Sequence, residues 1–107
     1  MPTLVIIGGG PAGLSAAIYA VRAGLDVQVL YKDDGALGKT DKIENYFGFP
    51  DVLSGAELLS RGRAQAERLG AQLHRTEVTG IEYADTGFTV KTTGGERHAD
   101  AVLLATG

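Results

Sequence analysis

A glycine-rich turn between two apolar segments constrains the fold of this chain more than any other feature. Gly8, Gly10 and Gly13 fit the pattern G-x-G-x-x-G, with the apolar run Thr3–Ile7 before them and a segment of helical periodicity, 14–23, after them. In a strand–turn–helix context, the first glycine allows a sharp turn and the second allows backbone to approach a pyrophosphate. The third allows the helix to pack closely on the strand, and the start of that helix favours bound phosphate. The sequence therefore predicts a dinucleotide site at the beginning of the chain.

Length, charge and composition exclude several other classes of protein. The 107 residues are enough for one small domain. The net charge of −3 comes without a long run of one sign, so we predict no nucleic-acid partner. No apolar run approaches the ~18 residues of a membrane span, and the N-terminus lacks the basic start of a signal peptide. We therefore predict no membrane partner and a cytoplasmic location. Because cysteine is absent, the chain itself offers no disulfide, thiolate metal site or redox dithiol.

The first part of the chain predicts a strand–helix–strand unit with a right-handed crossover. The strand Thr3–Ile7 is apolar on both faces, as a buried parallel strand is. Pro11 stands near the first position of the helix, where a missing N–H costs nothing, and Gly24 ends the helix. The second strand is expected over 27–31. The residues that recur at helical spacing and are expected to face the sheet are Leu14, Ala17, Ile18 and Val21.

The second part of the chain predicts a loop, a helix and five further strands. Residues 35–50 have no clear period, and an ordered loop of this length is often functional. Ser54 and Glu57 have the spacing of a capping box, which starts a helix that ends at Gly70. Its inner face is expected to carry Leu58, Gly62, Ala66 and Leu69, and Arg61 and Arg63 are expected on the outer face. The strands are expected at 72–74, at three antiparallel segments, Val78–Tyr83, Phe88–Thr92 and 96–98, and at the very apolar Ala101–Leu104.

Four segments, taken in order, resemble the FAD half of a thioredoxin reductase and, more broadly, the pyridine nucleotide-disulfide oxidoreductase family. They are the glycine turn 8–13, the stretch 42–50, the stretch 54–59 and the closing Ala-Thr-Gly at 105–107. Many nucleotide-binding folds share the glycine turn, whereas I-E-N-Y-x-G-F-P followed by S-G-x-E-L is much more specific. The resemblance implies an α/β fold. Its core would be a Rossmann-like parallel sheet with a βαβ dinucleotide-binding unit, interrupted by a three-stranded antiparallel crossover.

The resemblance also implies that FAD is the bound cofactor, and it distributes the contacts along the chain. The pyrophosphate is expected against the glycine turn, at Gly8, Gly10, Pro11, Ala12 and Gly13. The ribose and a phosphate are expected near Tyr31 and Lys32, and the adenine near the backbone of Val78. The flavin is expected along Gly35 to Leu37, with Ala36 between them, and beside Asn45. Thr106 and Gly107 are expected close to the phosphate and ribose region.

Three departures from the family pattern bear on what this chain does alone. Tyr31 stands where an acidic residue often binds the ribose hydroxyls. The NADPH site and the Cys-x-x-Cys of the family's second domain are absent, so NAD(P)H is expected only for a complete family member. Members of the family continue beyond the Ala-Thr-Gly turn and return with a Gly-Asp segment, whereas this chain stops at Gly107. We therefore expect 1–107 to be the N-terminal portion of an FAD-binding domain, incomplete at its C-terminus.

These features favour one function and leave two alternatives open. The favoured one is the FAD-binding part of a thioredoxin reductase-like oxidoreductase, which passes electrons from a reduced nicotinamide cofactor through FAD to a disulfide or another acceptor. One alternative is a non-catalytic or truncated nucleotide-binding module. The other is the NAD(P)-binding domain of an unrelated dehydrogenase, although the antiparallel strands and the region around Asn45 argue against it.

No side chain of this chain is predicted to act as a catalytic acid, base or nucleophile. His74 and His98 have no partner at metal-ligand spacing, so no metal site is predicted. For the loop aromatics Tyr46, Phe47 and Phe49, we favour anchoring of the loop to the core over stacking on a flavin. An incomplete domain would leave an apolar sheet edge, so self-association or a partner that completes the domain is expected.

Overall fold

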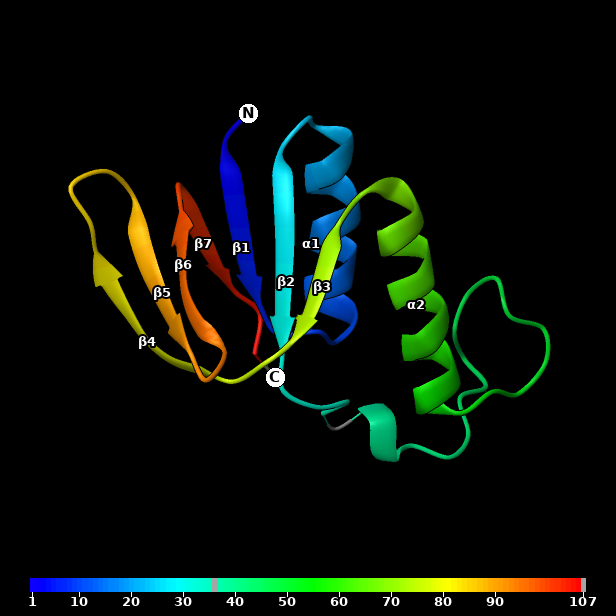
Figure 1. Ribbon diagram of the computed structural model, residues 1–107. Helices are drawn as coiled ribbons and strands as arrows, with labels where there is room; N and C mark the ends of the chain where they lie inside the picture. The colour runs from blue at the N-terminus through cyan, green and yellow to red at the C-terminus, as the bar shows by residue number, and fades with distance from the viewer. Residues whose placement is uncertain (36, 107) are drawn as a thin grey trace.

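The computed structural model of this chain describes residues 1–35 and 37–106, so Ala36 and Gly107 lie outside the described residues. The described part forms a four-stranded parallel sheet, a three-stranded antiparallel sheet and two α-helices (Figure 1). In chain order the elements are β1 (Thr3–Ile7), α1 (Pro11–Arg22), β2 (Asp26–Tyr31), the 3-10 turn η1 (Leu37–Lys39), α2 (Gly55–Leu69), β3 (Gln72–Arg75), β4 (Val78–Tyr83), β5 (Phe88–Thr92), β6 (Gly95–Ala99) and β7 (Ala101–Leu104).

The parallel sheet has the strand order β3-β2-β1-β7. β1 lies inside it, and Ile6 is in register with Val29 of β2 on one side and with Leu103 of β7 on the other. A parallel strand in this position is covered on both faces, and Val5 and Ile6 are accordingly both 0% exposed. Because the strands are parallel, the turns that follow β1, β2 and β7 all leave from the same edge of the sheet.

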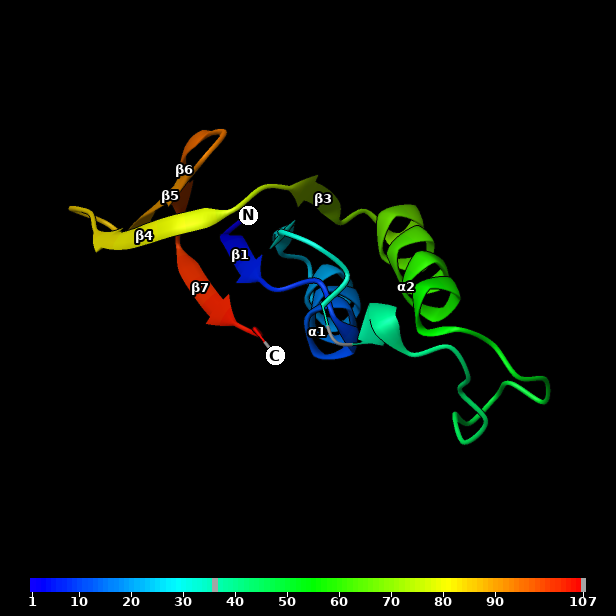
Figure 2. The same ribbon diagram turned by 90° about the horizontal axis from the view of Figure 1, so that it is seen from below.

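The two faces of the parallel sheet are covered by different layers. One face packs on α1 and α2, where Ile6 joins Leu14 and Leu59 in an apolar cluster. The other face packs on the antiparallel sheet, where Val5 joins Val90 in a second cluster. Figure 2 shows the helices on one side of the parallel strands and β4, β5 and β6 on the other. Successive side chains of β1 therefore point to opposite layers, as the pleat of a strand requires.

The predicted fold class is confirmed, including the antiparallel strands between β3 and β7. α2 begins at the predicted cap, because the Ser54 hydroxyl oxygen accepts a hydrogen bond from the Glu57 N–H at 3.1 Å. The expected inner face of α2 needs one correction. The fully buried side chains are those of Leu59 and Ala66, whereas Leu58 is half-buried.

The segment that joins β2 to α2 is irregular, as the sequence predicts, and it is tied down at two places. Ile43 and Leu53 form an isolated antiparallel bridge, and both side chains are buried. The Gly55 N–H donates to the Thr40 carbonyl at 2.7 Å, which fixes the segment to the start of α2. Within 1–35 and 37–106, neither helix combines the length and the apolar character needed to cross a bilayer.

Candidate functional site

The glycine turn lies at the end of β1, and two of its glycines are packed against neighbouring backbone and side chains. The Gly8 N–H donates to the Leu30 carbonyl at 2.9 Å, which ties the turn to β2. Gly8 has a φ of +121°, and a Cβ there would overlap with the Ala105 carbonyl oxygen. A Cβ on Gly9 would lie 2.6 Å from the Cβ of Tyr31. At these two positions the surroundings themselves exclude a side chain.

Gly10 is different, because a Cβ there would have no described heavy atom within 4 Å apart from its chain neighbours. Gly10 is the N-cap of α1, with extended backbone, and no described side chain caps this helix. Pro11 follows at the first helical position. The N–H groups of the first turn have no partner inside the helix, so the start of α1 is left open to an outside acceptor.

A pocket of about 510 Å³ lies over this end of the parallel sheet. Ligands of open α/β sheets bind at this edge, beyond the carboxyl ends of the strands. The pocket brings together most of the predicted site residues, namely Gly8, Gly10, Pro11, Ala12, Tyr31, Lys32, Gly35, Leu37 and Thr106. It also contains residues that the sequence prediction did not include, namely Gly9, Asp33, Asp34 and Ala105.

Three predicted residues lie outside this pocket, and one lies outside the described residues. Gly13 is buried behind the turn, against the backbone of Gly8. Asn45 is exposed in the segment between η1 and α2. Val78 is half-buried and packs on the cluster that contains Val5 and Val90. The prediction for Gly107 falls outside the described part of the chain. The pocket shows which predicted residues lie together, and the cofactor-binding roles of all of them stay predictions.

The lining residues that the prediction missed had a signal in the sequence. Asp33 and Asp34 follow β2 directly, and Ala105 follows β7 directly. The Ala105 N–H donates to the Ile7 carbonyl at 2.8 Å, which holds the end of β7 beside the glycine turn. Because the carboxyl ends of parallel strands meet at one edge, residues just after each strand are all candidates for the same site.

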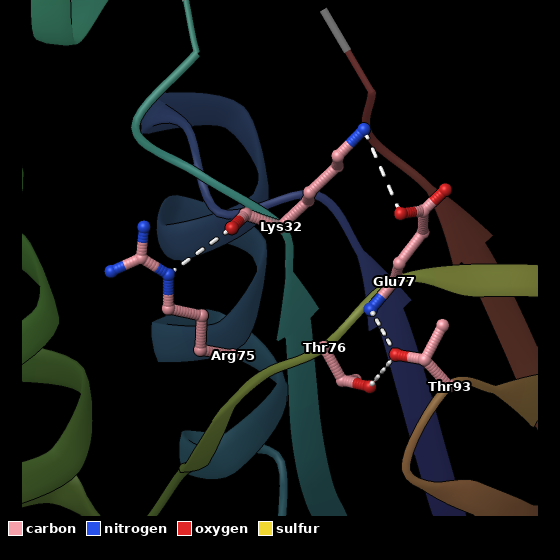
Figure 3. Close-up of polar contacts among 5 residues, drawn as sticks. All are labelled: Lys32, Arg75, Thr76, Glu77 and Thr93. Atoms are coloured by element: carbon pink, nitrogen blue, oxygen red, sulfur yellow. Dashed lines mark hydrogen bonds and ion pairs between the residues drawn. The ribbon is translucent and has the colours of Figure 1, made fainter.

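Lys32 lines the pocket and forms an ion pair with Glu77, which lies in the crossing segment between β3 and β4. Its Nζ lies 3.7 Å from Oε2 of Glu77, and both side chains are more than half exposed (Figure 3). Exposed pairs of this kind contribute little to stability. The pair nevertheless places a carboxylate and an ammonium group together beside a site predicted to take phosphate.

The same crossing segment joins the two sheets through hydrogen bonds. The Thr76 N–H donates to the Tyr31 carbonyl at 2.9 Å. At the end of β3, just before this segment, the Arg75 Nε donates to the Lys32 carbonyl at 3.2 Å. On the other side, the hydroxyls of Thr76 and Thr93 lie 3.2 Å apart (Figure 3). These contacts fix the backbone at the end of β2, where the predicted ribose contact lies.

A second, smaller pocket of about 120 Å³ lies between α1 and α2 and includes Tyr46 and Phe49. The rings of Tyr46 and Phe49 have centroids 5.6 Å apart, and the Arg61 guanidinium lies 5.4 Å from the centroid of Phe49. Phe49 is half-buried, in keeping with the anchoring predicted for it. The same prediction is wrong for Phe47, which lies in a turn of the loop with its side chain 99% exposed.

The titratable side chains of the described residues do not gather as metal ligands. Within 1–35 and 37–106, no three His, Asp or Glu side chains come close enough to hold a metal ion. The carboxylates at the pocket are instead engaged with cations or backbone: Asp33 accepts a hydrogen bond from the Gly35 N–H at 2.8 Å, and Asp34 pairs with Arg63.

Comparison with known proteins assigns the chain to a family. The family described as pyridine nucleotide-disulphide oxidoreductase matches residues 2–107. The chain belongs to this family. Among curated members, a thioredoxin reductase of Aquifex aeolicus is 46% identical over 107 residues, which cover 97% of this chain and 33% of that protein. The NADPH-dependent thioredoxin reductase 3 of Arabidopsis thaliana is 41% identical, with 97% of this chain and 21% of that protein covered.

Solved structures of pyridine nucleotide-disulphide oxidoreductases agree with this assignment. The atypical thioredoxin reductase TRi of Desulfovibrio vulgaris Hildenborough superposes with a TM-score of 0.91 at 46% identity, over 100% of this chain and 36% of that one. A thioredoxin reductase of Gloeobacter violaceus superposes with a TM-score of 0.93 at 40% identity, over 99% of this chain and 34% of that one. The resemblance and the fold predicted from the sequence are thus confirmed. The chain spans between about a fifth and about a third of the length of these relatives.

Proposed function

We propose that this chain is the FAD-binding part of a thioredoxin reductase-like flavin oxidoreductase, with residues 1–107 forming the N-terminal portion of the FAD-binding domain. The observation that carries the proposal is the open position at Gly10, at the start of a helix that no described side chain caps. A diphosphate needs backbone N–H donors and room for close approach, and this turn offers both. The pocket beside the turn is large enough to take part of a dinucleotide.

The lining residues suggest how each part of FAD would be held. The backbone N–H groups of Gly10, Ala12 and Gly13 would face the pyrophosphate. Pro11, at the first helical position, has no N–H of its own to donate. Tyr31 and Lys32 would lie on the adenosine side, with the backbone of Val78 as the expected adenine contact. Gly35, Leu37 and Asn45 would lie on the flavin side, and Thr106 and Gly107 near the phosphate and ribose.

FAD, once bound, supplies the redox chemistry, because it accepts electrons from a reduced nicotinamide and passes them to an acceptor such as a disulfide. The residues of this chain bind and orient the cofactor. The chain contains no cysteine, so a dithiol acceptor would have to come from another segment or another protein. We propose no catalytic acid, base or nucleophile among its residues, and NAD(P)H as the electron donor only for a protein with a second nucleotide site.

A spectroscopic experiment tests this function and separates it from the two alternatives. The full-length polypeptide, meaning the whole protein that contains residues 1–107, is incubated with excess FAD, freed of unbound FAD by gel filtration, and titrated with NADPH or NADH without oxygen. Binding of NAD and NADP to the same polypeptide is measured in parallel. Retained flavin that loses its oxidised absorption band supports the proposal. Retained flavin that neither NADPH nor NADH reduces favours a non-catalytic nucleotide-binding module. Preferential binding of NAD or NADP over FAD favours the NAD(P)-binding domain of another kind of dehydrogenase.

The edge strand β7 supports the expectation of self-association or a completing partner. Leu104 is 67% exposed and Leu103 is 40% exposed, although both belong to the parallel sheet. Apolar side chains on a sheet edge favour coverage by another segment or another chain. Light scattering on the full-length polypeptide tests the self-association, and a monodisperse monomer would contradict it.

A further inference from the structure

The pocket beside the glycine turn is called the dinucleotide pocket below. Arg63 of α2 points toward it, although helical periodicity places Arg63 on the outer face of the helix. Its side chain is only 19% exposed. Its guanidinium carbon lies 4.5 Å from the centroid of the Tyr31 ring, and its Nη2 forms an ion pair with Oδ1 of Asp34. Its Nε is buried and makes no hydrogen bond within the described residues. Arg63 therefore contacts two residues that line the pocket, but it does not line the pocket itself.

Tyr31 connects Arg63 to the glycine turn. A Cβ on Gly9 would lie 2.6 Å from the Cβ of Tyr31 and 3.0 Å from its Cγ, so the side chain of Tyr31 packs directly on the backbone of Gly9. The guanidinium lies over the ring of the same tyrosine. The order in space is thus Arg63, Tyr31 and Gly9, from α2 across the end of β2 to the turn predicted to hold the pyrophosphate.

The charges around the pocket show why the ion pair matters. Asp33 and Asp34 both line the site, and neither charge would favour a diphosphate. Asp33 is partly satisfied by the Gly35 N–H, and Glu77 nearby is paired with Lys32. Asp34 depends on Arg63 for its countercharge. Without the guanidinium, the carboxylate of Asp34 would be unpaired. It would then repel the two negatively charged phosphates of a dinucleotide bound in the same pocket.

We infer that Arg63 is a positioning residue of the dinucleotide site, which neutralises Asp34 and holds the ring of Tyr31 against the glycine turn. This inference rests on the proposed FAD binding. Arg63 acts through Asp34 and Tyr31 and not by contact with the ligand. The effect of the Arg63 charge on FAD affinity can be separated from a general role of Arg63 in folding. If Arg63 acts by neutralising Asp34, removal of the Asp34 carboxylate should restore the affinity that Arg63→Met loses, whereas a loss caused by misfolding would remain.

The test is a titration of the full-length polypeptide with FAD, followed by the change in flavin fluorescence, for a set of four proteins. They are the wild type, Arg63→Met, Asp34→Asn and the double variant. Methionine is chosen because it keeps an apolar contact with the Tyr31 ring while it removes the charge and the hydrogen-bond donors of the guanidinium. Arg61→Met is the matched control, since Arg61 lies on the same helix and covers Phe49, away from the dinucleotide pocket.

Arg63→Met is expected to weaken FAD binding about fivefold, which is the size of effect that one unpaired charge has in a partly exposed site. Asp34→Asn alone should bind FAD as well as the wild type or better. The double variant should return to within about twofold of the wild type, and Arg61→Met should match the wild type. The loss in Arg63→Met should also shrink at high salt, because salt screens the repulsion.

Three results would overturn the inference. The first is wild-type affinity in Arg63→Met at low salt. The second is a double variant as weak as Arg63→Met, which would show a structural role without the charge. The third is a loss of FAD affinity of about fivefold or more in Asp34→Asn, which would show that Asp34 assists binding. This third result can be obtained even if Arg63→Met does not fold. Failure of the wild type to bind FAD would instead contradict the proposed function.

Discussion

The α-carbon of Gly13 lies so close to the carbonyl oxygen of Gly8 that a Cβ on Gly13 would overlap with it. The first residues of α1 therefore pack directly against the backbone of Gly8, where the glycine turn begins. The same hypothetical Cβ would lie 3.5 Å from Cγ2 of Ile6, inside the apolar cluster beneath α1. Gly13 therefore sets how closely the helix approaches β1, and through that it sets the position of the N–H groups at the pocket.

The first prediction is that Gly13→Ala destabilises the fold. The added methyl group meets backbone that cannot rotate away, so the free energy of unfolding should fall by about 3 kcal/mol, the upper part of the range for overpacked sites. Urea unfolding of the full-length polypeptide without added nucleotide measures this. Gly94→Ala is the control, because the nearest atom to a Cβ there is the Thr76 hydroxyl oxygen at an ordinary 3.5 Å. Equal stability of the two variants would contradict the prediction.

The second prediction is that Gly10→Ala weakens FAD binding and lowers the free energy of unfolding by no more than about 1 kcal/mol, the difference between glycine and alanine at a helix N-cap. The backbone of Gly10 is extended at φ −78°, which alanine also adopts, and its Cβ would point into open space. We propose that the pyrophosphate approaches through that space, so the affinity for FAD should fall by about tenfold or more, a loss near 1.4 kcal/mol. Thermal melting and equilibrium dialysis separate the two effects. A variant that binds FAD normally would show that the pyrophosphate lies elsewhere.

The sequence was sufficient to predict those features that arise from short-range patterns. The apolar run of β1, the glycine turn, the cap at Ser54 and the antiparallel strands are all visible as local spacing, and the structure has each of them. Glycines at fixed offsets between a strand and a helix allow few other geometries, which is why the turn and most of its pocket were predictable.

The features that the sequence did not reveal are contacts between distant segments. The inward turn of Arg63 toward Tyr31 depends on how α2 packs across the end of β2. The pair of Lys32 and Glu77 depends on the path of the chain between the two sheets. Helical periodicity alone places Arg63 on the outer face of α2. It describes only where the side chain starts, and a long arginine side chain can extend to contacts beside the helix.

The third prediction concerns the cap of α2. The Ser54 hydroxyl accepts a hydrogen bond from the Glu57 N–H, one of the donors that the helix cannot satisfy internally. Ser54→Ala should lower the free energy of unfolding by about 1 kcal/mol. Ser60→Ala, at an exposed interior position of the same helix, should leave stability equal or slightly higher, since alanine favours helix. Chemical denaturation measures both, and an equal loss in the two variants would argue against the cap.

The fourth prediction is a pH dependence from His74 of β3. Partial burial and, secondarily, the Arg97 guanidinium lower the pKa of His74 from its ordinary value of 6.5. The folded state thus favours the neutral ring, so this site costs no stability above pH 6.5 and destabilises the fold as the pH falls below that value. An NMR titration of the His74 ring measures the midpoint directly. A midpoint at or above the ordinary value would contradict the assigned causes, and Arg97→Gln should move it upward.

We propose that the backbone amides of the opening glycine turn hold the diphosphate of FAD. The most direct test is a titration of the ¹⁵N-labelled full-length polypeptide with FAD, observed at the amide resonances of Gly9, Gly10, Ala12 and Gly13. We predict that these signals shift together and reach saturation with the same affinity that flavin fluorescence reports. Saturable binding of FAD that leaves these four amide signals unshifted, or no binding at all, would show that the glycine turn does not hold the diphosphate.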